Sequence, residues 1–126
     1  MTIARDIELE ILMNDCIFCK IITGDIPSTG VYRDAQAIAF RDINPAAPTH
    51  ILIVPIKHLD SVNVIGAADE PLMGHLFSIA KQLAAQEGVA DDGYRLILNT
   101  GAHAGQTVPH LHLHFLGGAP MKHPMG

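Results

Sequence analysis

The sequence predicts an α+β domain in which an antiparallel five-stranded sheet carries one long helix and a short N-terminal helix. Several short β-prone segments are separated by turn residues, and only one long segment, Asp69 to Glu87, has the apolar spacing of a helix. The final β-prone segment alternates histidines with apolar residues, as a strand with one buried face does. Strands on both sides of a single long helix are typical of a sheet backed by that helix.

The N-terminal part of the chain is expected to hold one short helix. Residues 1–13 are interpreted as an extension before a domain of residues 14–126, because the sequence after Met13 resembles a fresh beginning. Cys16 to Thr23 is predicted to be helical and to end at Gly24, since glycine readily takes the left-handed conformation that closes a helix.

The sequence also marks both ends of the long helix. Asp69 suits the N-cap, Pro71 suits the first turn, and Gly88 follows the last turn. A short turn or helix at Leu59 to Val64 leads into it. Its apolar stripe is wider than one sheet face requires, which is compatible with contact to a partner subunit or with a fully covered core helix.

Five strands flank this helix in the sequence. They are rich in β-branched and other apolar residues and are bounded by turn-forming residues. The predicted strands are Val31–Arg33, Ala37–Arg41, His50–Pro55, Tyr94–Asn99 and Thr107–Leu116.

Three histidines occupy alternate positions of the last predicted strand. Because successive side chains of a strand point to opposite faces, His110, His112 and His114 share one face, and the apolar residues between them share the other. The imidazole is the side chain whose ordinary pKa lies nearest neutrality. The strand therefore predicts a face suited to nucleophilic attack, proton transfer or metal binding, with a core behind it.

Composition excludes several functions. The 126 residues, 48% of them apolar, suit one globular domain. A net charge of −5 without a basic run argues against wrapping nucleic acid, although backbone amides can still hold a small nucleotide. No apolar run approaches the ~20 residues of a membrane span, and the N-terminus lacks the basic start of a signal peptide. With two closely spaced cysteines, a reducing cytoplasmic location is expected.

The segment before the histidines, Gly101 to Val108, contains two glycines, small residues and a hydroxyl. Such a segment brings backbone N–H groups close to an anion, and Gln106 and Thr107 can add side-chain hydrogen bonds. An ordinary turn between two strands would explain the glycines equally well. Next to a nucleophilic face, an anion-binding loop indicates phosphoryl chemistry through a covalent histidine intermediate.

These segments together resemble the histidine triad (HIT) superfamily, over nearly the whole chain from about Cys16 to Gly126. The resemblance rests on the alternating histidines followed by Leu116-Gly117-Gly118, and on three earlier segments. Those segments are Ile17–Ile22, Ala39–Pro45 and Ala47–Pro55. The two glycines after the histidines and the short Pro-Met ending are similar to the Hint branch of nucleoside phosphoramidases, more than to the diadenosine-polyphosphate hydrolases.

The resemblance implies a division of roles among the residues. His112 would be the nucleophile that takes the nucleotidyl group, and His114 would hold phosphate oxygens. Asp42 would accept hydrogen bonds from the ribose hydroxyls. The remaining nucleotide-binding positions would be Ile26, Phe40 and Ile43 at the base, Asn99 beside the phosphate, and Gly105, Gln106, Thr107 and Val108 around the phosphate and leaving group.

The pair Cys16 and Cys19 has the spacing of a structural zinc site, which needs two more ligands such as His50 and His110. The alternative is two reduced, partly buried thiols. With zinc bound, His110 is a ligand and takes no part in proton transfer. Without zinc, His50 and His110 would join the catalytic group and orient His112. Catalysis itself is expected to need no cofactor.

The predicted function is that of a cytoplasmic, homodimeric hydrolase or nucleotidyl transferase that cleaves purine nucleoside phosphoramidates. Its substrate would be a purine nucleotide, and it would bind neither nucleic acid nor a membrane. Three other functions use the same residues: hydrolysis of dinucleoside polyphosphates, nucleotide-binding scaffolding with incidental catalysis, and metal catalysis at the three histidines. His58 is expected near the mouth of the pocket.

Overall fold

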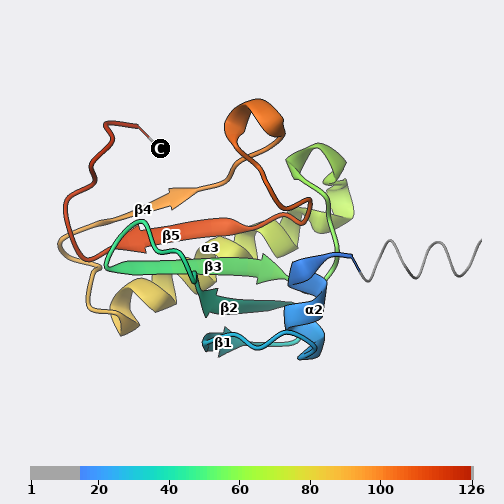
Figure 1. Ribbon diagram of the computed structural model, residues 1–126, viewed down its shortest axis with the longest axis horizontal. Coiled ribbons are helices and arrows are strands. Elements are labelled where there is room, and N and C mark those ends of the chain that lie inside the picture. The colour runs from blue at the N-terminus through green and yellow to red at the C-terminus, as the bar shows by residue number, and fades with distance from the viewer. Residues whose placement is uncertain (1–14, 126) are drawn as a thin grey trace, which may run out of the picture.

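The computed structural model describes residues 15–125, and these form the α+β domain that the sequence predicts (Figure 1). The proposed extension, residues 1–13, lies outside the described residues. In chain order the helices and strands are α2 (Ile17–Thr23), β1 (Gly30–Arg33), β2 (Ala37–Arg41), β3 (Thr49–Pro55), α3 (Glu70–Gln86), β4 (Tyr94–Ile97) and β5 (Leu113–Gly117). Short 3₁₀ turns at Val62–Val64, Ala67–Asp69 and Ala102–Ala104 connect them. Within residues 15–125, no helix combines the length and the apolar character that crossing a membrane requires.

The strands form one antiparallel sheet in the order β1-β2-β3-β5-β4, with β3 at the centre. Leu52 of β3 lies opposite Phe40 of β2 on one side and His114 of β5 on the other. Residues directly opposite one another in a sheet point to the same face. The register therefore sets His114 in one row with two apolar side chains.

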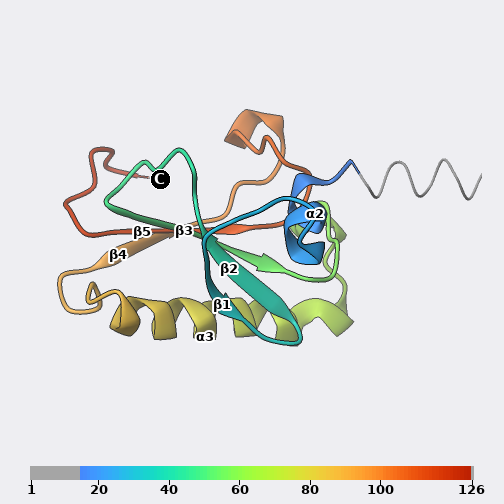
Figure 2. The same ribbon diagram turned by 60° about the horizontal axis from the view of Figure 1, so that its bottom comes forward.

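Helix α3 covers one face of the sheet along its length (Figure 2). Alternate positions of β2, β3 and β5 pack against it, and all are buried. This main core includes Ala37, Ala39, Ile51, Ile53, Leu113 and Phe115 from the strands, and Leu76, Ile79 and Leu83 from α3. The core holds the sheet as a rigid support for its opposite face.

The opposite face of the sheet carries a smaller apolar cluster and helix α2. Phe18 of α2 packs there with the strand residues that alternate with those of the main core, namely Ile38, Phe40, Leu52 and Val54. Figure 2 shows α2, the β2–β3 connection and the β4–β5 connection on the side of the sheet away from α3.

Helix α2 ends at Gly24 as predicted but begins at Ile17, one residue later than predicted, with Cys16 as its N-cap. The thiol of Cys16 accepts a hydrogen bond from the backbone N–H of Cys19 at 3.3 Å and so caps the first turn. Gly24 closes the helix at φ +87°, and its N–H donates to the carbonyl of Ile21. These caps fix the position of the two cysteines at the start of the helix.

Asp69 does not cap α3, which corrects one prediction. Its backbone has helical dihedral angles, φ −91° and ψ −9°, instead of the extended conformation that aims a capping side chain at the helix. The carboxylate accepts hydrogen bonds from the N–H of Gly66 at 2.9 Å and from Nζ of Lys57 at 2.6 Å. Pro71 lies in the first turn as predicted.

The last two strands are shorter than predicted: β4 ends at Ile97, and β5 begins only at Leu113. Pro109 has no N–H to donate to a strand ladder. The N–H of Leu111 donates to the carbonyl of Leu59 at 2.7 Å, outside the sheet. His110 and His112 therefore precede the strand, yet the alternation persists, since Leu111 is buried in the α3 core.

Candidate active site

A cavity of about 410 Å³ opens on the sheet face opposite α3. It is bounded by α2, the end of β2 and the segment that carries the histidines. Eight of the residues named from the sequence line it: Ile26, Phe40, Asp42, Ile43, Thr107, Val108, His112 and His114. The cavity thus brings together six of the nine predicted nucleotide-binding residues with two of the histidines.

Three of the predicted nucleotide-binding residues, Asn99, Gly105 and Gln106, are not among those that line the cavity, and neither are His50 and His110. The backbone N–H groups of Gly105 and Gln106 donate to carbonyls within their own loop, those of Ala102 and Gly101. The Gln106 side chain also serves the loop, because its amide donates to the carbonyl of Asp60 at 2.7 Å. The part of this segment that faces the cavity is Thr107 and Val108.

Helix α2 supplies a wall that the sequence reasoning missed. Ile17, Phe18 and Ile21 line the cavity and share one side of the helix. The apolar spacing of these three residues could have indicated that one side of this short helix packs against the rest of the domain. The other lining residues missed are Pro27, Ser28, Arg41, Asn44 and Leu52.

His112 presents a free ring nitrogen to the cavity. Its Nδ1 lies 2.7 Å from the carbonyl oxygen of His110, which only accepts, so Nδ1 carries the proton. The lone pair is then on Nε2. Phe18 packs edge-on against the ring, with centroids 4.9 Å apart. Burial lowers the pKa of His112 although the His110 carbonyl and Asp42 oppose this, so the imidazole is neutral and nucleophilic.

His114 and His50 form a second hydrogen-bonded group with Asp42. His50 Nε2 lies 3.0 Å from His114 Nδ1 and 3.5 Å from Asp42 Oδ2. Burial lowers the pKa of both histidines; for His114, with the neighbouring His112 and His50 adding to the effect, it falls to about 4. Both rings are therefore neutral near pH 7. A carboxylate beside the cavity can accept hydrogen bonds from hydroxyl groups of a ligand.

A separate cluster of thiols and imidazoles lies at the start of α2. His110 Nδ1 lies 3.2 Å from Cys16 Sγ and 3.6 Å from Cys19 Sγ, and His58 Nδ1 lies 3.4 Å from Cys19 Sγ. The four ligand atoms lie within 4.8 Å of one another. Burial, followed by a hydrogen bond with Cys16, raises the pKa of Cys19 to about 11, so without a cation Cys19 is a thiol.

The hydrogen bonds behind this cluster fit a zinc ion. His110 Nε2 donates to the carbonyl of Pro55 at 2.8 Å, and His58 Nε2 donates to Asp60 Oδ1 at 2.8 Å. Each bond leaves a lone pair on Nδ1, which faces the sulfurs. Zinc-binding histidines have the same arrangement, because their second ring nitrogen donates to an outer hydrogen-bond partner. Two thiols and two imidazoles are the donor set of a tetrahedral structural zinc site.

The fourth member of this cluster is His58, which corrects the expectation that His50 would complete it. His50 lies opposite Leu116 in the β3–β5 ladder. Leu116 is six residues beyond His110, a separation of about 20 Å along an extended chain. His58 instead follows the other end of β3, where the carbonyl of Pro55 already contacts His110.

The fold and the site define a class of protein: an α+β domain that presents a neutral, nucleophilic imidazole to a cavity on the open face of its sheet. The chain belongs to the HIT domain family, whose sequence profile matches residues 23–121. This confirms the resemblance that the sequence alone indicated.

Individual relatives agree with this assignment. The chain is 50% identical over 110 residues to the purine nucleoside phosphoramidase of Escherichia coli K12, covering 87% of this chain and 92% of that protein. It is 50% identical over 113 residues to the 14 kDa zinc-binding protein of Zea mays, covering 87% of each. The crystal structure of a HIT family hydrolase from Legionella pneumophila Philadelphia 1 matches with a TM-score of 0.86 and 47% identity, covering 89% of this chain and 100% of that one.

Proposed function

We propose that this protein hydrolyses purine nucleoside phosphoramidates through a nucleotidyl-histidine intermediate on His112. The observation that carries the proposal is the state of this ring: neutral, with its Nδ1 proton held by a carbonyl and its Nε2 lone pair available at the cavity. The name of the E. coli relative supports the choice of substrate.

The reaction has two displacements at phosphorus. First, Nε2 of His112 attacks the phosphorus, the P–N bond breaks, and the amine leaves with a proton taken from solvent. Water then attacks the phosphorus of the nucleotidyl-histidine, the bond to Nε2 breaks, and a proton returns to solvent. The products are an amine and a nucleoside monophosphate, and covalent catalysis divides one difficult step into two.

The cavity walls supply the binding contacts in this proposal. Asp42 accepts hydrogen bonds from the ribose hydroxyls, and Phe40, Ile43 and Ile26 contact the purine. His114 donates to a phosphoryl oxygen, and Thr107 lies beside the leaving group. All of these residues line the same cavity as His112.

Zinc has a structural role in this proposal and takes part in no chemical step. Cys16, Cys19, His58 and His110 would hold it, and the relative named as a zinc-binding protein supports its presence. Bound zinc would tie α2, the segment after β3 and the histidine segment together. The wall that α2 forms would then be fixed relative to His112.

We also propose that two copies of the chain associate through β4 and α3. Among the strands of residues 15–125, β4 is at an edge of the sheet, so its outer side can pair with a strand of a second copy. Phe77 of α3 is 54% exposed, so α3 presents a large apolar side chain that a second copy could cover. Light scattering on the full chain tests this, with Phe77→Asp expected to yield monomers.

Turnover and intermediate trapping test the function. An AMP-linked amine is compared with a dinucleoside polyphosphate as substrate, and acid-free quenching followed by mass spectrometry detects the nucleotidyl group. We expect the phosphoramidate to be preferred and His112→Ala to lose both turnover and the adduct. The matched control is His103→Ala, at an exposed residue that does not line the cavity. Normal turnover by His112→Ala would overturn the mechanism.

A further inference from the structure

We propose that the backbone amide of Ala46 sets the tautomer of His50, and that His50 in turn makes His114 the hydrogen-bond donor of the site. Ala46 and His50 are then positioning residues that act through His114. The role assigned to His114 rests on the proposed function, but the tautomers themselves do not.

The tautomer of His50 is set by its contact with the loop before β3. The N–H of Ala46 donates to Nδ1 of His50 at 3.0 Å. A backbone amide can only donate, so Nδ1 must carry a lone pair. The ring of His50 is buried, 7% exposed, which disfavours the charged imidazolium. A neutral His50 with a lone pair on Nδ1 carries its proton on Nε2.

The Nε2 proton of His50 has a defined acceptor. His50 Nε2 lies 3.0 Å from His114 Nδ1 and 3.5 Å from Asp42 Oδ2, so the shorter contact is the hydrogen bond. His114 Nδ1 accepts it and therefore has no proton. The proton of His114 is on Nε2, on the side of the ring away from His50. In the other tautomer of His114, two N–H groups would face each other at 3.0 Å.

The result is that two neighbouring imidazoles have opposite tautomers. His112 has its proton on Nδ1 and a lone pair on Nε2, because of the carbonyl of His110. His114 has a lone pair on Nδ1 and a proton on Nε2, because of Ala46 and His50. Their ring centroids are 5.0 Å apart, and both line the cavity. One ring can thus attack a phosphorus while the other donates to a phosphoryl oxygen.

The tautomer of His50 also explains why Asp42, His50 and His114 are not a metal site, although their ligand atoms are close together. A cation there would need the lone pair of His50 Nε2. The proton would have to move to Nδ1, where it would face the N–H of Ala46. The cysteine cluster differs in this respect. Nε2 of His58 and Nε2 of His110 donate to acceptors, so each Nδ1 keeps a lone pair that a cation could use.

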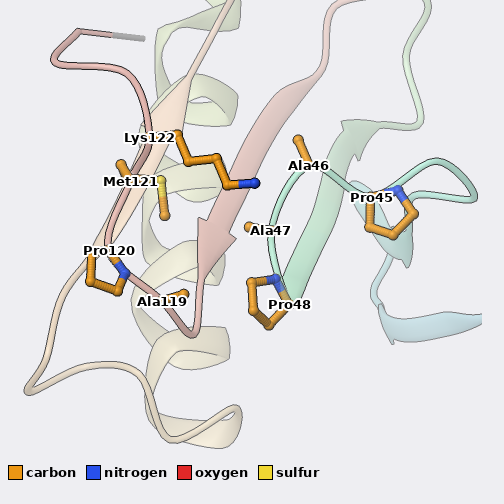
Figure 3. Close-up of a pocket in the computed structure, with 8 residues that line it drawn as sticks. All are labelled: Pro45, Ala46, Ala47, Pro48, Ala119, Pro120, Met121 and Lys122. Atoms are coloured by element: carbon orange, nitrogen blue, oxygen red, sulfur yellow. The ribbon is translucent and has the colours of Figure 1, made fainter.

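The loop that carries Ala46 faces the C-terminal segment across a cavity. Pro45, Ala46, Ala47 and Pro48 form one wall of a cavity of about 380 Å³, and residues 119–122 form the other (Figure 3). Figure 3 shows Lys122 extending from the C-terminal segment toward the loop. Two prolines restrict the backbone on either side of Ala46. The amide is thus presented to His50 by a loop with little freedom.

The direct test is nitrogen-15 NMR of the histidine rings in the full chain without substrate. We expect His50 and His114 to have the proton on Nε2, and His112 to have it on Nδ1. A proton on Nδ1 of His114 would overturn the proposal. This result is independent of turnover, whereas failure of the wild-type protein to cleave any AMP-linked amine would overturn the proposed function alone.

The second test is a double-mutant cycle between Ala46→Pro and His50→Gln. Proline removes the amide proton, and we expect kcat to fall by up to about 100–1,000-fold, the cost of losing one hydrogen-bond donor to the transition state, with AMP affinity unchanged. In His50→Gln, the amide nitrogen of the introduced side chain can donate to His114 without help from Ala46. Ala46→Pro should then cause no further loss in the His50→Gln background.

Two controls separate tautomer control from loop damage. Ala47→Pro introduces the same residue one position later and leaves the Ala46 N–H in place, so kcat should change less. His50→Leu cannot donate to His114 and should be slower than His50→Gln. An equal loss from Ala46→Pro in both backgrounds would mean that the loop matters only structurally, and would overturn the proposal.

Discussion

Nδ1 of His58 lies 3.4 Å from the sulfur of Cys19, which joins the segment after β3 to the first turn of α2. His110 completes the connection through both sulfurs, so three segments distant in sequence meet at four side chains. A cation at this point would cross-link the segment that carries the nucleophile to the helix that forms a cavity wall.

Zinc content should depend on His58 and not on His50. We expect His58→Ala to lose most of its zinc after dialysis, because a tetrahedral site with three protein ligands binds less tightly and exposes its ion. His50→Ala should retain zinc, since His50 lies in the other histidine group. Elemental analysis per protein chain measures both. Loss of zinc from His50→Ala, with His58→Ala unaffected, would contradict the assignment.

Removal of zinc should lower both the melting temperature and the affinity for AMP. A ligand that binds only the folded state stabilises it, so chelation removes that contribution. Nucleotide affinity should fall as well, because Phe18 and Ile21 of α2 line the cavity. Calorimetry with and without a chelator measures both effects, and adding zinc back should restore them. An unchanged AMP affinity in the zinc-free protein would show that α2 holds its position without the ion.

The sequence correctly predicted the order and type of the helices and strands, but it missed some of their ends and the contacts between distant segments. The alternation at His110, His112 and His114 correctly separated a core face from a chemical face, since strand periodicity is a local property. The choice between His50 and His58 depended on the pairing of β3 with β5, which no local pattern shows. Likewise, the hydrogen bonds of Gln106 within its loop are known only once the loop geometry is known.

Asp42→Asn should weaken discrimination for ribose hydroxyls. The Asx turn in which Asp42 Oδ1 accepts from the N–H of Asn44 at 2.8 Å can survive in the variant, so the side chain should stay in place. A charged acceptor contributes about 1.5–3 kcal/mol per hydrogen bond. We expect wild type to prefer a ribonucleoside substrate over its 2′,3′-dideoxy analogue by at least about tenfold in kcat/KM. The variant should show a smaller preference, because its neutral amide forms weaker hydrogen bonds than a carboxylate. An undiminished preference would place the ribose elsewhere.

Asp34→Asn should destabilise the protein in a pH-dependent way. Burial would raise the pKa of Asp34, but hydrogen bonds from Tyr32, the N–H of Gln36, His75 and the N–H of Ala37 outweigh it and lower this pKa far below its ordinary value. These contacts join the β1–β2 turn to α3, with His75 Nε2 at 2.6 Å. The stabilisation is therefore complete above the unfolded pKa of about 4 and is lost as the pH falls further.

For Asp34→Asn we expect a decrease of about 1–2 kcal/mol in the free energy of unfolding at pH 7. The difference from wild type should shrink below about pH 4, where protonation weakens the same contacts in the wild-type protein. Urea unfolding at several pH values measures this, with Asp91→Asn in an exposed turn as the control. A difference that stays constant down to pH 2 would contradict the role of the carboxylate charge.

Gly118→Ala should damage catalysis as well as stability. Gly118 has φ +93°, and a Cβ there would lie 3.0 Å from Cβ of Pro48, in the loop that presents Ala46 to His50. A non-glycine residue in this region loses about 1–2 kcal/mol, and the contact with Pro48 adds a displacement of the loop.

Gly88 also has a positive φ, +73°, but nothing lies within 4 Å of a Cβ built on it. Gly88→Ala is therefore the matched control for the backbone effect alone. We expect both variants to unfold more readily in urea, and only Gly118→Ala to lower kcat for an AMP-linked amine. If the two variants had equal kcat, the loop would not transmit the position of the C-terminal segment to His50.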